Sequence, residues 1–498
     1  MCFLRGGAKL NYVAVFDIGT TAIKGVLLSR EGTIHNEYSV TIRTYYGENG
    51  EHEQNPEEWW SGVQTITNEW FEKNDILPEY IKAITFSGQM EDVIFIQEGQ
   101  ETTKAILYSD NRASKEAQFV NERLPQLSHV TGNTIRSSTP LAKLIWIKNQ
   151  GILKERVSVV FSSKDYVIYK LTNCIATDYV TAATTGMMDL QSRKWGKEPL
   201  ATFELDACFE LPELVPAEHL VGRVTEKGAT QTGFLKGTPV LCGAGDAGAS
   251  TMGAGAISEG DCYMYLGTTG WIAVPTRDSN PKEFGIFTLA HLVPQLNIAI
   301  APLLNVGNVH HWAMETVIGY QDYDQFEAEI EKSPPGANGL FFLPYLHGER
   351  CPIQDSEAMG AYWGIGPKTT KADFARASLE GIGYSLLQIT NMLVQQEKGT
   401  ITVIGGGAKS PTLCQLIADM TNKEVRVPEK SEYLPSIGMG VTAFKYLGWL
   451  KDYREFSQPS LLSTPDKVYV PNIENTKRYQ QFYETYVKLY PAMVQIYR

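Results

Sequence analysis

The sequence Val13-Ala14-Val15-Phe16-Asp17-Ile18-Gly19-Thr20-Thr21 runs from an apolar, β-rich segment into a short polar turn. The apolar pattern resumes from Ile23 to Leu28, so the two runs predict a β-hairpin. The sequence Cys262-Tyr263-Met264-Tyr265-Leu266-Gly267-Thr268-Thr269-Gly270 repeats this plan later in the chain. Two similar halves, each presenting a hydroxyl-lined turn to a shared cleft, are the simplest explanation, and chance recurrence of Gly-Thr-Thr is the alternative. The glycine-rich stretch 243–255 lies just before the second copy and predicts the boundary between the halves.

Helical patterns lie between and after these turns. Asn55-Pro56-Glu57-Glu58 has the residues of a helix start: an Asn N-cap, a Pro at the first helical position and a Glu three residues after the cap. Apolar residues follow at helical spacing, at Trp59, Val63, Ile66 and Trp70. A second stripe, Leu379, Ile382, Leu386, Ile389 and Leu393, precedes a predicted strand over 400–404, three glycines and another helix. Strands that alternate with helices predict an α/β fold.

Length and composition restrict the class of protein. With 498 residues, the chain has room for two large domains or about three of ordinary size. The 44 basic and 56 acidic side chains give a net charge of −12, which argues against nucleic acid or an anionic membrane as a partner. Seven scattered cysteines without a C-x-x-C pair argue against a disulfide framework or a zinc site. Neither a signal peptide nor an apolar run of the ~20 residues needed to span a membrane is found, so we expect a cytoplasmic protein.

The first turn, Asp17 to Thr21, has the residues of a phosphate site. Gly19 allows close approach of a phosphate, while Thr20 and Thr21 add hydroxyl and N–H donors. Asp17 would hold water on a Mg²⁺ that bridges phosphate oxygens, and Lys24 could add a positive charge. An ordinary hairpin with an Asp in its turn is the alternative.

The sequence Cys242-Gly243-Ala244-Gly245-Asp246-Ala247-Gly248 matches the dinucleotide pattern G-x-G-x-x-G after a strand. Asp246 argues against that reading, because its carboxylate would stand where a pyrophosphate should bind. A carboxylate displayed on a turn of small residues is what a general base needs. A structural Asp that caps the next helix is the alternative. No Walker-type G-x-x-x-x-G-K-[ST] occurs in the sequence.

Polar groups also follow two other predicted strands, in Ser87-Gly88-Gln89-Met90-Glu91-Asp92 and in Tyr108-Ser109-Asp110-Asn111-Arg112. Ends of strands are where α/β proteins bind ligands, and these amide, carboxylate and guanidinium groups suit a polyhydroxylated molecule. Ordinary solvated loops are the alternative.

Taken together, these motifs resemble the FGGY carbohydrate kinase family of the actin-like ATPase superfamily, and the xylulokinases in particular. The resemblance extends from about Val13 to about Leu450 and includes Gly405-Gly406-Gly407-Ala408-Lys409-Ser410-Pro411 as an adenosine motif. It implies an α/β protein with two actin-like (ribonuclease H-like) domains and a central cleft. The sugar-binding domain would span 12–248 and the nucleotide-binding domain 249–498.

The resemblance also assigns roles. Asp246 matches the general base, Asp17 the acid beside the metal and the γ-phosphate, and Lys24 a basic phosphate contact. Both Asp17 and Asp246 would reach Mg²⁺, through water. The phosphate and ATP contacts would be Asp17, Gly19, Thr20, Thr21, Lys24, Gly267, Thr268, Thr269, Gly406, Gly407 and Ala408. The substrate contacts would be Gln89, Met90, Glu91, Asp92, Asp110, Arg112 and Asp246.

One motif departs from the family pattern. Xylulokinases show Gly-Gln-Met-His-Gly, but here Gln89-Met90 is followed by Glu91-Asp92. We expect these carboxylates to repel an aldonate and to favour a neutral ketose or polyol.

The sequence therefore predicts ATP- and Mg²⁺-dependent phosphorylation of a neutral sugar on a terminal hydroxyl, with a pentulose such as xylulose favoured. Another ketose or a polyol such as glycerol is the alternative within the kinases, and an NAD-dependent oxidoreductase or a non-catalytic sugar sensor lies outside them. The expected partners are the sugar and ATP, without nucleic acid or membrane, and a homodimer is left open.

Overall fold

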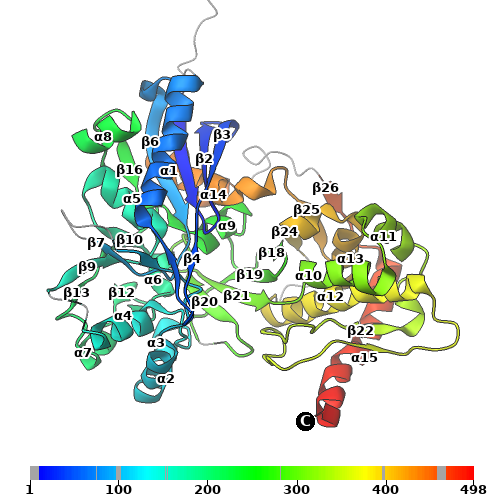
Figure 1. The fold of residues 1–498 in the computed structure, drawn as a ribbon. Coiled ribbons are helices and arrows are strands. Elements are labelled where there is room, and N and C mark those ends of the chain that lie inside the picture. The colour runs from blue at the N-terminus through cyan, green and yellow to red at the C-terminus, as the bar shows by residue number, and fades with distance from the viewer. Residues whose placement is uncertain are drawn as a thin grey trace, which may run out of the picture.

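The computed structural model describes residues 11–74, 76–96, 103–151, 153, 155–280, 282–394, 399–456 and 467–497. These residues form two seven-stranded sheets, each in its own domain (Figure 1). The path of the first sheet is β15 (Leu220–Arg223), β16 (Pro239–Leu241), β6 (Ile81–Gly88), β1 (Tyr12–Ile18), β2 (Ala22–Ser29) and β3 (Ile34–Thr41), with β17 (Ala244–Gly245) also paired to β6. The path of the second sheet is β20 (Phe287–Ala290), β21 (Asn297–Leu303), β19 (Gly270–Thr276), β18 (Cys262–Leu266), β24 (Thr400–Ile404), β25 (Glu424–Val427) and β26 (Lys467–Tyr469).

The two sheets share a pairing pattern. In the first, β1 pairs antiparallel with β2 and parallel with β6, and β2 continues antiparallel to β3. In the second, β18 pairs antiparallel with β19 and parallel with β24, and β19 continues antiparallel to β21. The hairpin predicted at Val13–Leu28 is confirmed, and the repeated Gly-Thr-Thr occupies the same topological position in both sheets.

Helices cover the outer face of each sheet. In the first domain these are α1 (Pro56–Asn68), α5 (Ser163–Thr172) and α8 (Glu226–Thr232). In the second they are α10 (Gly307–Trp312), α11 (Tyr323–Ile330), α12 (Lys371–Leu393), α13 (Pro411–Thr421) and α15 (Ile473–Tyr497). The predicted helix start at Asn55 is confirmed, since its side chain accepts a hydrogen bond from Glu57 N at 3.1 Å. Glu58 does not complete a capping box; its carboxylate accepts from the Tyr45 hydroxyl at 3.0 Å.

The remaining described elements add a lobe to the first domain and short connections elsewhere. The helices of the lobe are α2 (Ser114–Arg123), α3 (Leu127–Thr131), α4 (Pro140–Asn149), α6 (Tyr179–Ala183) and α7 (Lys197–Thr202). The short strands are β4 (Tyr45–Tyr46), β5 (His52–Gln54), β7 (Ile94–Ile96), β8 (Ala105–Ile106), β9 (Val157–Val160), β10 (Ala176–Asp178), β11 (Met188–Asp189), β12 (Lys194–Trp195), β13 (Phe209–Glu210), β14 (Glu213–Val215), β22 (Phe341–Leu343) and β23 (Ala361–Trp363). Among the described helices, none has the length and apolar character to cross a bilayer.

Two helices lie between the sheets: α9 (Asp246–Gly253) and α14 (Leu434–Tyr446). One apolar core joins them to Val13 and Val26 of the first sheet and to Ala273 and Ile300 of the second. Figure 1 shows α14, in orange, beside α9 and the blue strands of the first domain, although it comes from the C-terminal part of the chain. The two domains are thus joined by a shared core.

The helices α9 and α14 cross with their backbones in close contact at Gly438. A Cβ on Gly438 would lie 2.2 Å from Ala249 O and 2.7 Å from Gly253 N. Because both obstacles are backbone atoms, we expect Gly438→Ala to lower the free energy of unfolding by about 2–3 kcal/mol, despite the higher helix propensity of Ala. Thermal melting checks this, with Gly366→Ala as control, since a Cβ there meets nothing within 4 Å. Equal melting temperatures for the two variants would contradict the tight crossing.

Candidate functional site

The first predicted phosphate-binding turn, Asp17 to Thr21, is held in place by the buried side-chain amides of Gln54 and Gln89. Gly19 N donates to Ala22 O at 3.1 Å, which closes the hairpin. Thr20 Oγ1 donates to Gln89 Oε1 at 2.8 Å, and Gln54 Nε2 donates to Thr20 O at 2.6 Å. Gln89 Nε2 in turn donates to Gln54 Oε1 at 3.0 Å. Gln89, predicted to touch a sugar, therefore also ties the end of β6 to this turn; Thr21 remains exposed at its tip.

Asp17 and Lys24 face each other across the hairpin, in register. Burial raises the pKa of Asp17, and the Ser87 hydroxyl and Lys24 partly oppose that rise. The Lys24 ammonium donates to Glu432 O at 3.2 Å and lies 5.7 Å from the centre of the Tyr433 ring. In this structure it therefore contacts the segment that leads into α14, and its role as a phosphate contact stays a prediction.

Asp246 is the first residue of α9, directly after β17. Gly243 has φ +64°, and a Cβ there would lie 1.9 Å from Phe86 O, so the turn requires glycine. A Cβ on Gly245 would lie 2.1 Å from Met90 Sδ, which brings the turn against the predicted sugar loop. The strand–turn–helix order agrees with the G-x-G-x-x-G pattern, but the helix begins with a carboxylate.

The Asp246 side chain is open to solvent, and its Oδ1 accepts from Ala247 N at 2.8 Å. The protein packed around it nevertheless removes part of the carboxylate's hydration, and this raises the pKa of Asp246 to about 7. Repulsion from Asp17, and more weakly from Glu91 and Asp178, acts in the same direction. The structure thus brings Asp246, Asp17 and the predicted sugar loop together.

The sugar loop contains one half-buried and one fully buried carboxylate. Glu91 has φ +61°, and its carbonyl oxygen accepts from Lys143 Nζ at 2.7 Å. Burial raises the pKa of Glu91, while Lys143, Ser138, Arg136 and Arg350 lower it.

Asp92 is 0% exposed. Its Oδ1 accepts from Tyr108 N at 3.3 Å, and its Oδ2 has no hydrogen-bond partner among the described residues. Burial raises the pKa of Asp92 well above the ordinary range. A direct contact of Asp92 with a ligand stays a prediction, and its burial argues against one.

Asp110 and Arg112 form an ion pair in the first domain. Asp110, which is fully buried, accepts from His52 N at 2.8 Å and from Arg112 Nη2 at 2.7 Å. Arg112 also pairs with Glu53 at 2.8 Å and lies over Trp146. These contacts stabilise the neighbouring loops, and the sugar contacts predicted for both residues remain untested.

The second turn is supported by α10. Gly307 N donates to Gly267 O and Asn308 N to Thr268 O, both at 3.0 Å. Thr268 and Thr269 are exposed, so their hydroxyls are accessible.

The glycines after β24 differ in what surrounds them. A Cβ on Gly405, at φ +89°, would lie 2.7 Å from Leu266 O, and one on Gly407 would lie 2.8 Å from Leu266 Cβ. Gly406 is exposed, and a Cβ there meets nothing within 4 Å. Gly405 and Gly407 thus allow close packing against Leu266, beside the second turn. Ala408 is buried. Of these four residues, Gly406 is the one whose backbone is exposed to solvent.

Sequence reasoning missed the buried lysines. Lys143 is fully buried in α4 and donates to Glu91 O and Leu107 O, both at 2.7 Å. Lys164 is fully buried at the start of α5. For Lys143, the signal available in the sequence was its place within an otherwise apolar helical segment, Leu141 to Ile147.

Comparison with known proteins agrees with this arrangement. The N-terminal domain of the FGGY family of carbohydrate kinases matches residues 12–253, and its C-terminal domain matches residues 262–445. A xylulose kinase from Staphylococcus epidermidis is 32% identical over 490 residues, 96% of each chain. A gluconokinase from Bacillus subtilis is 31% identical over 443 residues, 85% of each chain. The solved structure of a ligand-bound xylulose kinase from Lactobacillus acidophilus superposes with a TM-score of 0.87 at 28% identity, covering 97% of this chain and 99% of that one.

These matches confirm the predicted α/β fold with two actin-like domains, since sequence and structure both align over nearly the whole chain. Because the matching family consists of carbohydrate kinases, they also argue against a dinucleotide-binding site at residues 243–248. The chain belongs to the FGGY family of carbohydrate kinases and is a sugar kinase.

Proposed function

We propose that this kinase transfers the γ-phosphoryl group of ATP to a terminal hydroxyl of a neutral pentulose such as xylulose, with Asp246 as the general base. Kinases of the family use ATP as substrate. The observation that carries the proposal is the Asp246 carboxylate, which is open to solvent, lies beside Asp17 and the sugar loop, and has its pKa raised to about 7. A base with a pKa near the working pH combines a large deprotonated fraction with useful proton affinity.

In the proposed reaction, the sugar hydroxyl gives its proton to Asp246 as its oxygen bonds to the γ-phosphorus, and the bond to the ADP oxygen breaks. Phosphoryl transfer needs mainly positioning and charge neutralisation from the protein. The exposed Thr21, Thr268 and Thr269 supply hydroxyl donors at the two turns for phosphate oxygens.

Mg²⁺ fits these residues. Asp17 and Asp246 repel each other, and the nearby Lys24 ammonium is engaged with Glu432 O. Two carboxylates in this relation suit a hydrated divalent cation, which would neutralise phosphate charge when bound. A cytoplasmic location and a homodimer stay predictions.

An aldonate is a second candidate substrate, because the expected repulsion is weaker than the sequence suggested. Asp92 is fully buried and presents no carboxylate to solvent. The Glu91 carboxylate is stabilised by Lys143, Arg136 and Arg350. Arg136 and Arg350 are exposed, and neither guanidinium forms an ion pair or hydrogen bond with a described residue. A gluconokinase is among the relatives.

The first prediction concerns the base. Asp246→Asn keeps the shape of the side chain but removes the proton acceptor, so we expect kcat to fall by about 10²–10⁴ while sugar and ATP still bind. In the parent, kcat/KM should rise with pH through about 7 and level off above it, because the base must be deprotonated. The variant should lack this acidic limb. Steady-state kinetics between pH 5.5 and about 9 check both points, and near-normal turnover of the variant would exclude Asp246 as the base.

The second prediction concerns the nucleotide. Gly406→Val should raise the KM for ATP, because its side chain would project from the open backbone of the adenosine motif. The KM for the sugar and the melting temperature should stay near those of the parent. Gly407→Val is the informative contrast, since its side chain would overlap Leu266 and should lower stability as well. An unchanged KM for ATP in Gly406→Val would remove this loop from the nucleotide site.

The third prediction separates the two substrate candidates. An ATP-consumption screen across ketoses, polyols and aldonates should show the highest kcat/KM with a pentulose. Arg136→Gln and Arg350→Gln should then change kcat/KM little for that substrate. If an aldonate is instead preferred and either substitution raises its KM at least tenfold, roughly the 1.4 kcal/mol of one weakened ion pair, the aldonate assignment replaces the pentulose.

A further inference from the structure

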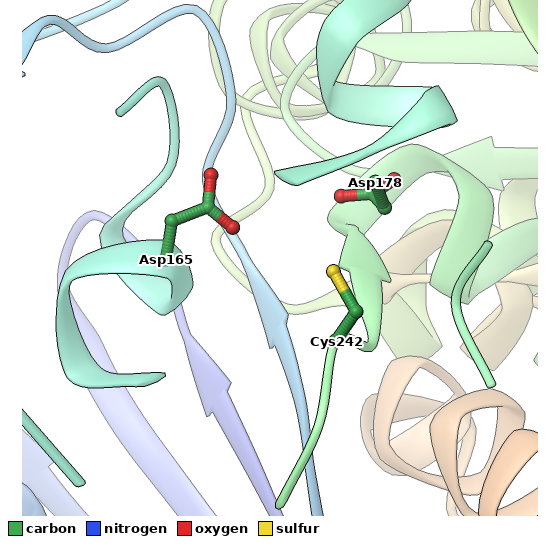
Figure 2. Close-up of side chains that lie close together, drawn as sticks. All are labelled: Asp165, Asp178 and Cys242. Atoms are coloured by element: carbon green, nitrogen blue, oxygen red, sulfur yellow. The ribbon is translucent and has the colours of Figure 1, made fainter. Parts of the chain in front are cut away.

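Three side chains with metal-ligating atoms meet beneath the Asp246 turn: Asp165, Asp178 and Cys242. Figure 2 shows them pointing toward a common centre, and their ligand atoms lie within 4.8 Å of one another. A cation already occupies this cluster. Lys164 Nζ lies 2.5 Å from Asp165 Oδ1, 2.9 Å from Asp178 Oδ2 and 3.8 Å from Cys242 Sγ. The chain thus supplies the positive charge that a metal would bring.

We propose that Lys164 is a positioning residue for Asp246, acting through Asp178. This inference rests on the proposed function, in which Asp246 is the general base. Lys164 itself touches neither the sugar nor ATP in this scheme; its ammonium fixes the carboxylate on which the Asp246 turn rests.

Asp178 contacts the turn that carries Asp246. Asp178 Oδ1 accepts from Val180 N at 2.8 Å and from Thr181 N at 3.1 Å, and so caps α6. The same oxygen lies 3.5 Å from Gly245 N, the residue before Asp246. Asp178 Oδ2 accepts from Thr181 Oγ1 at 2.6 Å.

The Thr181 hydroxyl adds a second contact with the turn, since a Cβ on Gly245 would lie only 3.1 Å from Thr181 Oγ1. Asp178 and the Thr181 hydroxyl that it holds therefore form the surface against which the Gly245 backbone packs.

The start of α5, which includes Lys164, contacts the ends of β1 and β6. Ser163 Oγ donates to Ile18 O at 2.8 Å, between Asp17 and Gly19. A Cβ on Gly88 would lie 2.8 Å from Ser163 Oγ and 3.1 Å from Lys164 Cβ. The first turn of α5 thus contacts the ends of β1 and β6, and the ammonium of Lys164 links them to the Asp246 turn.

Lys164 and the two carboxylates also depend on one another electrostatically. Lys164, Asp165 and Asp178 are each at most 1% exposed, so water does not replace a missing partner at low cost. Burial alone would lower the pKa of Lys164, but attraction from Asp165 and Asp178 outweighs it and raises the pKa above its ordinary value. The ammonium therefore stays charged, and the link between α5 and Asp178 persists at working pH.

The test uses a variant that preserves the net charge of the cluster. Lys164→Met alone leaves two buried carboxylates without a cation and should melt well below the parent. Lys164→Met combined with Asp165→Asn removes one positive and one negative charge, while Asp178 keeps its donors from α6. Lys170→Met is the matched control, because Lys170 lies on the same helix but pairs with Glu57 at 2.7 Å, away from Asp178.

We expect the double variant to fold and to lose about 10- to 100-fold in kcat, with the KM values for sugar and ATP close to those of the parent. The amides of segments 178–185 and 243–250 should exchange hydrogen faster than in Lys170→Met. In an Asp246→Asn background, the same double substitution should not lower the residual kcat further, because the group that it positions is already gone.

Unchanged kcat together with unchanged exchange would overturn the inference. An equal fold-loss of kcat in the Asp246→Asn background would also overturn it, because Lys164 would then act on general packing. Failure of the proposed function has a different signature, near-normal turnover of Asp246→Asn alone. In that case the exchange measurement still decides whether Lys164 holds the turn.

Discussion

The packing of α9 between the two domains is the constraint on which the site depends. A Cβ on Gly248 would lie 2.6 Å from Val180 Cγ2, and one on Gly253 would lie 1.9 Å from Leu434 O. On its other side, Thr251 Oγ1 donates to the Tyr263 hydroxyl of the second sheet at 3.4 Å. A helix packed in this way links Asp246 to both domains. Gly243, Gly245, Gly248 and Gly253 lie within the predicted boundary between the halves, and each also allows close packing.

The charges around α9 bear on the proposed role of a divalent cation. Asp246 begins the helix, where the dipole stabilises a negative charge, yet desolvation by the surrounding protein and repulsion from Asp17 raise its pKa to about 7. An ATP phosphate would add further negative charge beside Asp17 and Asp246. The nearby buried cations already have partners: Lys143 donates to two carbonyl oxygens, and Lys164 contacts two carboxylates. Neutralisation by a divalent cation is therefore the arrangement that these charges favour.

Local patterns predicted much of the fold, while contacts between distant segments did not show in the sequence. The hairpin at Asp17 and the helix after Asn55 were predictable because their signals lie within a few residues. The packing of α14 on the first sheet joins residues far apart in the chain, so no local signal marks it. Burial was equally hidden: Glu91 and Asp92 are adjacent in sequence, but only Asp92 is fully enclosed. Gly407 shows the same difficulty, since its need for glycine comes from Leu266.

The two repeated turns share a topology but differ in how they are held, and this difference bears on the roles proposed for them. Thr20 is hydrogen-bonded through its hydroxyl to Gln89 and through its carbonyl to Gln54, so the first turn is held against the predicted sugar loop. Thr268 and Thr269 keep their side chains exposed, and the second turn is held through its backbone by the start of α10. In the proposed reaction, a turn tied to the predicted sugar loop would set the distance between acceptor hydroxyl and phosphate, and the exposed hydroxyls of the second turn would be accessible to the nucleotide. One hairpin plan is thus held in two different ways, and Asp246 begins the helix packed between the two domains.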